Sequence, residues 1–155
     1  FVRLSIVKPS FDYIIIILEG EIMSDVIKYK DSHNSIMAIL IPADHISEGI
    51  EFLTSDDDYM QVACMGHPAG HIIIPHYHNR VERIIDHTCE TLIIRKGILF
   101  VDLYEDKEVT YSFKMKVGDI LTLYSGGHGF RVVEDVDMVE IKQGPYVGPN
   151  DKTRF

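Results

Sequence analysis

Two histidines separated by a single residue, His76 and His78, have the spacing in this sequence that best suits metal binding. On a β-strand alternate side chains share a face, so the two imidazoles would lie about 6–7 Å apart along the chain. Neutral imidazole is a common ligand of divalent transition metals. Glu90 and His128, the latter in a glycine-rich stretch, would add a carboxylate and a third imidazole. Such a set suits one divalent ion of iron, manganese, nickel, cobalt, copper or zinc.

The spacing of these residues resembles the first sequence motif of the cupin family, G-x5-H-x-H-x3or4-E-x6-G. The matching residues are Gly70, His76, His78, Glu90 and Gly97. The departure is the gap before the glutamate, which holds eleven residues, 79–89, instead of three or four. Glu82 has the short spacing, but no glycine follows it six residues later. The glutamate role is therefore assigned to Glu90, with Glu82 as the alternative.

The second cupin motif, G-x5-P-x-G-x2-H-x3-N, is matched only in part. Gly118 and Gly126 fit, Tyr124 stands at the proline position, His128 comes one residue early, and the final asparagine has no match. The resemblance covers about residues 59–142 and is closest to small bacterial single-domain cupins without an assigned reaction. It implies a double-stranded β-helix, or jelly roll, with a metal at the mouth of the barrel. The implied metal ligands are His76, His78, Glu90 and His128.

Short apolar segments separated by Gly, Pro, Asp or Asn independently indicate an all-β protein, and no long segment has helical periodicity. Turns are expected between these segments, at residues 96–97 and 134–135 among others. The first 45 residues are the hardest to assign and are expected to supply edge strands or a short helix near residues 22–28. The candidate strands are residues 13–18, 35–41, 59–65, 71–78, 90–95, 98–104, 110–115, 120–124, 130–133 and 138–142.

A length of 155 residues predicts a single domain, residues 1–155. Within it we expect N-terminal strands or an edge extension over residues 1–58 and a barrel core over residues 59–143. The tail, residues 144–155, is rich in glycine, proline and charge, and is expected either to pack on the body or to fray.

The net charge of −9 argues against a nucleic acid or an anionic membrane surface as partner. The longest aliphatic run, residues 14–18, is far shorter than the ~20 residues that span a bilayer. Cys64 and Cys89 are not in a C-x-x-C pair and are expected to be buried thiols in a reducing compartment, which makes the cytoplasm the default location. Exposed sheet edges, with residues 13–18 as the candidate, predict a homodimer.

The function expected from these features is that of a small metalloenzyme, an oxygenase or an isomerase, acting on a carbohydrate-derived or carboxylate substrate. Three histidines and one glutamate around a divalent ion carry a net charge of about +1, which favours an anionic small-molecule ligand. The alternatives are a non-catalytic metal-dependent binding or sensor module and a structural jelly roll without metal. Candidate catalytic residues are Tyr124, Glu82 and His87, and candidate substrate-binding residues are Arg80, Arg83, Asp102, Tyr104 and Arg131.

Overall fold

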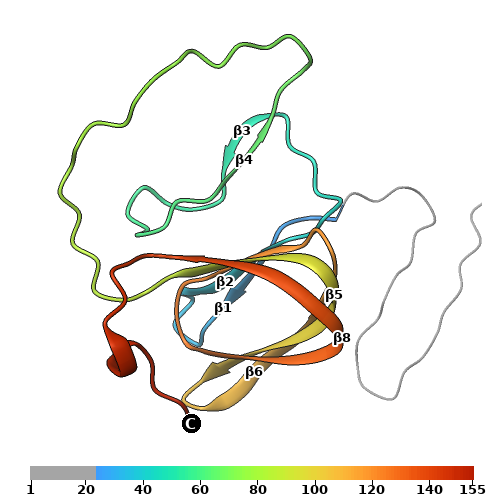
Figure 1. Cartoon of the computed structure of the whole chain (residues 1–155), viewed down its shortest axis with the longest axis vertical. Coiled ribbons are helices and arrows are strands. Elements are labelled where there is room, and N and C mark those ends of the chain that lie inside the picture. The colour runs from blue at the N-terminus through green and yellow to red at the C-terminus, as the bar shows by residue number, and fades with distance from the viewer. Residues whose placement is uncertain (1–23) are drawn as a thin grey trace, which may run out of the picture.

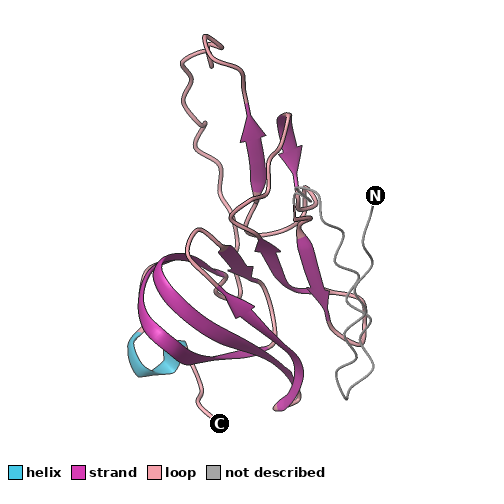
Figure 2. Ribbon diagram, turned by 90° about the vertical axis from the view of Figure 1, so that its right-hand side faces the viewer, coloured by secondary structure: helices cyan, strands magenta, loops and turns pink. Residues whose placement is uncertain are grey.

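In the part of the chain that the structure describes, the regular structure is almost entirely β-strand, as the sequence predicts (Figures 1 and 2). The computed structural model describes residues 24–155, so the candidate strand at residues 13–18 lies outside the described part. Within that part, no helix is long and apolar enough to cross a membrane. The elements are β1 (Ile27–Lys30), β2 (Ile36–Ile41), β3 (Gly49–Phe52), β4 (Ala63–Gly66), β5 (Glu90–Glu105), β6 (Glu108–Met115), β7 (Ile120–Leu123), β8 (Gly127–Lys142) and the 3-10 helix η1 (Gly148–Asp151).

Six of the strands form one antiparallel sheet that curls into a half-barrel (Figure 1). Its order is β1-β2-β7-β5-β6, and β8 pairs with the other edge of β5. The central strand β5 changes partner along its length, because residues 90–93 pair with β7 and residues 99–105 pair with β6. On its other side, β8 follows it from Glu90 to Tyr104. The hairpin β3–β4 forms a separate two-stranded sheet.

The two longest strands, β5 and β8, run side by side as a bent ribbon of 16 residues each. The prediction of turns at residues 96–97 and 134–135 is wrong, since both positions are bulges at which the paired strands bend together. Gly97 has a φ of +80°, and a Cβ there would overlap the carbonyl group of Asp135. The close approach therefore requires glycine at the bend.

The curled sheet buries an apolar layer on each face. Alternate residues of β5, including Leu92 and Ile94, point into the half-barrel and are 1% exposed. The opposite face carries a second cluster that includes Ile39, Leu53 and the free thiol of Cys89, whose pKa is raised by burial. Cys64, also a free thiol, is only partly buried. Two-sided burial explains why the strands of this sheet read as nearly continuous apolar runs.

The N-terminal assignment is settled in favour of an edge strand, because Ile27–Lys30 is β1 at the edge of the sheet. The helix expected near residues 22–28 is therefore wrong over its described part, residues 24–28. The candidate strand at residues 59–65 is reduced to β4, because the chain turns at residues 56–57 and stays irregular up to residue 62.

Residues 67–88, called the arm from here on, form a long irregular segment that leaves β4 and returns to β5 (Figures 1 and 2). The strand predicted at residues 71–78 is wrong in this structure, since those residues have no strand pairing within the described chain. Apolar composition favours a strand only where another backbone supplies the hydrogen bonds. The large apolar residues of the arm remain exposed: Ile72, Ile73, Ile74, Tyr77, Val81, Ile84 and Ile85.

Candidate functional site

Glu90 and His128 meet at the inner mouth of the half-barrel. Glu90 is the first residue of β5 and shares the inner face with Leu92, while His128 lies opposite Leu103 near the other end of the strand. The curl of the β5–β8 ribbon brings these distant positions together, so that Glu90 Oε2 lies 3.2 Å from His128 Nε2. The glutamate side chain is 12% exposed and the imidazole 32% exposed. The pair is therefore held by the fold and still open to a ligand.

Lys142, the last residue of β8, brings a cation next to this pair. Its Nζ lies 3.1 Å from Asp151 Oδ2 and 3.8 Å from Glu90 Oε1. The hydrogen bond to Asp151 is the main cause of the raised pKa of Lys142, and nearby Glu140 and Glu90 add to it. Lys142 is not among the site residues predicted from the sequence. Lys142 lies opposite Glu90 in the β5–β8 register, and this pairing exists only in the folded chain.

A cavity of about 860 Å³ opens beside Glu90 and His128. The C-terminal tail forms much of its wall, and the Phe155 ring packs edge-on against Tyr104 at a centroid distance of 5.3 Å. The tail is thus packed on the body, one of the two expected arrangements. The volume of the cavity is in the range of small-molecule binding sites. The polar and titratable residues at the cavity wall are Asp86, His87, Thr88, Glu90, Tyr104, His128, Asn150, Asp151, Lys152, Thr153 and Arg154.

Of the candidate catalytic residues, His87 lies at this cavity. Its Nδ1 is 2.6 Å from Asp86 Oδ1, and its ring meets Tyr59 edge-on at 5.0 Å. Tyr124 lies elsewhere, 7% exposed, where its hydroxyl donates to the Met60 carbonyl and burial raises its pKa. A buried phenol with a raised pKa and a committed proton is a poor general base. Glu82 lies exposed in the arm.

The other two predicted metal ligands, His76 and His78, lie in the exposed arm, with ring centroids 5.4 Å apart. The Nδ1 of His76 is 2.9 Å from the Ile74 carbonyl oxygen. Because a carbonyl only accepts, Nδ1 carries the proton, and Nε2 of a neutral ring keeps its lone pair for a metal. Within residues 24–155, however, no three His, Cys, Asp or Glu side chains come close enough to hold an ion. The structure brings two of the four predicted ligands together and leaves the other two apart.

The candidate substrate-binding residues are also divided between places. Arg80 and Arg83 lie exposed in the arm, and Tyr104 lines the cavity. Asp102 and Arg131 face each other on neighbouring strands, with Arg131 Nε 2.8 Å from Asp102 Oδ2.

The Asp102–Arg131 pair has a local structural role. Ser112 also donates to Asp102, at 2.6 Å, and the guanidinium of Arg131 lies 5.1 Å from the centre of the Phe100 ring. The hydrogen bonds from Arg131 and Ser112 lower the pKa of Asp102 to about 2. These contacts occupy both charges and account for polar residues in an otherwise apolar strand.

Comparison of the chain with protein-family models, with curated proteins and with solved structures gives no significant match.

Proposed function

We propose that this protein is a metal-binding jelly roll of the cupin type, in which Glu90 and His128 form the preset half of the metal site. The single observation that carries the proposal is their 3.2 Å separation at the mouth of a curled sheet. Two donors bound at right angles to one ion, each about 2.1 Å from it, are about 3 Å apart. The pair therefore already has the spacing of two adjacent ligands.

The strand pairing supports a double-stranded β-helix. Each half of β5 pairs with one half of β8 on one side and with a different short strand, β7 or β6, on the other. Two bent ribbons that wind around a common axis produce this exchange of partners. Within the described chain, β8 has β5 as its only pairing partner, so its other edge is free to accept a strand.

In this proposal the arm supplies that strand and, with it, the two missing ligands. If residues 71–78 extend along the free edge of β8, then Ile72, Ile74, His76 and His78 fall on one face. Ile72 and Ile74 are each 78% exposed in the present structure. Burying each would stabilise the closed form by about 1.5–3 kcal/mol. The same movement would bring the two imidazoles toward Glu90 and His128.

The assembled site would hold one divalent ion with three nitrogen ligands and one oxygen ligand, which leaves two positions of an octahedron open. When bound, the metal would supply Lewis-acid chemistry toward a carbonyl or hydroxyl group of the substrate, or the redox chemistry of an oxygenase. Around it, the chain contributes an 860 Å³ cavity with Lys152 and Arg154 at its wall. Because Asp86, Glu90 and Asp151 share that wall, the preference for a small anionic substrate, such as a carboxylate, comes from the net charge of about +1 on the ion with its four ligands.

Titration with cobalt(II), followed by its visible absorption, tests the metal site directly. We expect one ion per chain and the visible spectrum of cobalt(II) bound by nitrogen and oxygen ligands. Glu90→Gln removes the anionic ligand and His78→Ala removes an imidazole, so each should weaken binding by at least the roughly 10- to 100-fold typical of residues that only support a ligand. His71→Ala is the matched control, because this histidine is also in the arm but is stacked on His67 at 4.2 Å. Equal binding by His78→Ala and wild type would overturn the proposal.

Amide hydrogen exchange tests the closure of the arm. Adding the metal should slow exchange over residues 71–78 and along the free edge of β8, and Glu90→Gln should prevent that slowing. Metal binding without new protection in the arm would show that the ion is held by a different set of ligands.

A further inference from the structure

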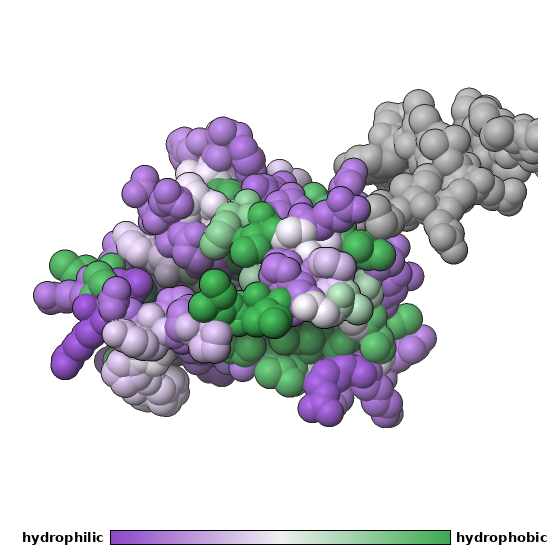
Figure 3. All heavy atoms as spheres, turned by 90° about the horizontal axis from the view of Figure 1, so that it is seen from above, coloured by the Kyte–Doolittle hydropathy of each residue, from purple (hydrophilic) through white to green (hydrophobic). Residues whose placement is uncertain are grey.

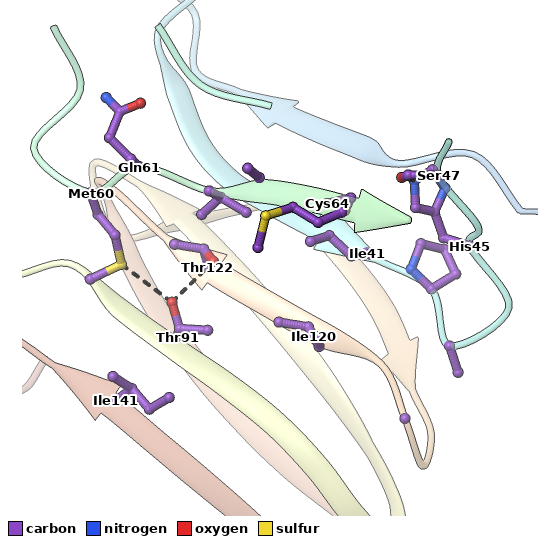
Figure 4. A pocket seen from close by; sticks show the side chains of 16 residues that line it. Ile41, His45, Ser47, Met60, Gln61, Cys64, Thr91, Ile120, Thr122 and Ile141 are labelled. Carbon is purple, nitrogen blue, oxygen red and sulfur yellow. Dashed lines mark hydrogen bonds between the residues drawn. The ribbon is translucent and has the colours of Figure 1, made fainter. Parts of the chain in front are cut away.

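A second cavity, of about 510 Å³, lies on the back of the curled sheet, beneath the hairpin β3–β4 (Figure 4). The floor comes from β2, β5, β7 and β8, and the side wall comes from β4 and the segment before it. Thr91 lines it, while its neighbour Glu90 faces the opposite side of β5. The cavity is therefore separated from the proposed metal site by the thickness of one sheet.

Among residues 24–155, those that line this cavity include no Lys, Arg, Asp or Glu, although these four types make up 25% of the chain. Transferring a charged ligand from water into such surroundings would cost far more free energy than transferring a neutral polar group that finds no hydrogen-bond partner there. The lining thus selects uncharged molecules. Its residues are Ile41, Pro42, Ala43, His45, Ser47, Met60, Gln61, Val62, Ala63, Cys64, Met65, Thr91, Gly118, Ile120, Thr122 and Ile141.

One end of the cavity carries two threonine hydroxyls that share one hydrogen bond. Thr91 Oγ1 lies 3.1 Å from Thr122 Oγ1 and 3.3 Å from the sulfur of Met60 (Figure 4). If Thr122 donates to Thr91, the Thr91 proton has only the thioether, which is a weak acceptor. A ligand oxygen placed here would accept a stronger hydrogen bond than the sulfur does.

The other end of the cavity is polar but internally satisfied. Figure 4 shows His45 and Ser47 together, away from the threonine pair, with Ile41, Ile120 and Cys64 between the two ends. His45 Nδ1 donates to the Ser24 carbonyl at 3.3 Å, and Nε2 lies 3.1 Å from Ser47 Oγ. Because both ring nitrogens have partners, this end offers no free donor comparable to Thr91.

We propose that this cavity binds an uncharged, elongated and mostly apolar small molecule whose carbonyl oxygen accepts the hydrogen bond of Thr91. The apolar body of the ligand lies along Ile41 and Ile120. This proposal does not depend on the metal site.

The test uses the full chain and the uncharged fluorescent probe N-phenyl-1-naphthylamine. We expect saturable fluorescence enhancement and displacement of the probe by octan-2-one. Octanoate, which has the same chain length and a negative charge, should displace it at least about 10-fold less well. No saturable binding, or equal displacement by the ketone and the carboxylate, would overturn the proposal.

Two variants locate the binding. Ile141→Arg places a charge at the cavity, where Ile141 is 51% exposed, and should abolish probe binding. Val139→Arg is the control, because Val139 is 37% exposed on the same face of the same strand but does not line the cavity. Unchanged binding by Ile141→Arg would contradict the location.

Thr91→Val removes the hydroxyl and keeps the shape of the side chain. It should weaken the binding of octan-2-one about 3- to 10-fold, as expected for the loss of one hydrogen bond, and leave the binding of the hydrocarbon nonane unchanged. Equal loss for both compounds would refute the role of Thr91. Light scattering addresses the competing occupant: a wild-type dimer that Ile141→Arg converts to a monomer would mean that a second copy covers this face, which also overturns the proposal.

Discussion

The β5–β8 ribbon and the arm contain similar residues in opposite surroundings. Ile94 of β5 is 1% exposed, whereas Ile74 of the arm is 78% exposed. Figure 3, which looks onto the molecule from the side of the hairpin and the arm, shows apolar residues open to solvent among polar ones. The two segments differ in pairing, since β5 has partners on both edges and the arm has none among the described residues. In these two segments, the exposure of an isoleucine depends on whether its backbone has a partner strand and not on the residue type.

The histidines show the same contrast. His128, on the ribbon, lies against Glu90, while His76 and His78 lie exposed in the arm. Changes in the ribbon should therefore affect stability in every state, whereas changes in the arm should affect it only in the proposed metal-bound form.

The largest expected effect is on the core. Ile94→Ala should lower the free energy of unfolding by about 2–5 kcal/mol, because it opens a cavity under β5. Ile74→Ala is the same substitution in the arm and should change it by less than about 0.5 kcal/mol. Urea denaturation of both variants measures the difference, and equal losses would show that the arm is already part of the cooperative core.

Metal binding should reduce the difference in stability between the β5–β8 ribbon and the arm. With free metal at 100 to 1,000 times its dissociation constant, the linkage relation gives a stabilisation of about 3–4 kcal/mol. A chelator should remove it while leaving the apo protein folded, since the core forms without the ion. Thermal unfolding with and without chelator provides the measurement. Unfolding of the apo protein would instead mean that the metal supplies the folding energy.

The bend of the ribbon gives the next effect in size. Gly97→Ala should destabilise by about 2–4 kcal/mol, because the new Cβ meets the Asp135 backbone in a left-handed conformation. Gly70, in the arm, has a similar φ of +86° but nothing within 4 Å of a Cβ. Gly70→Ala should therefore cost only the strain of a left-handed residue, about 1–2 kcal/mol. Circular dichroism melts of the two variants check the ranking.

The smallest effect comes from the Asp102–Arg131 pair. Because the folded pKa of Asp102, about 2, lies below the usual value of about 3.9, the ionised form stabilises the fold above that usual value. Asp102→Asn should lose about 1–2 kcal/mol at pH 6, a modest figure because the Arg131 side chain is 61% exposed. The gap between variant and wild type should shrink as pH falls from 4 to 2. A gap that is independent of pH would exclude the charge as its cause.

Local sequence was enough to predict the all-β class and most of the strands of the sheet. The predicted strands at 35–41, 110–115 and 120–124 match β2, β6 and β7 to within a residue or two. Alternation along residues 90–95 puts Glu90 on the same face as Leu92 and Ile94, and both of these apolar residues are buried. These features depend on neighbours two residues apart, so the sequence alone can encode them.

Long-range pairing decided the rest. Gly97 looks like a turn residue in the sequence, yet it is the bend of a continuous strand because β8 runs beside it with a matching bulge. The contact between Glu90 and His128, and the position of Lys142 next to them, depend on the curl of that ribbon. Residues 71–78 have a strand-like composition but no strand, since backbone hydrogen bonds need a second chain segment that their own sequence cannot provide.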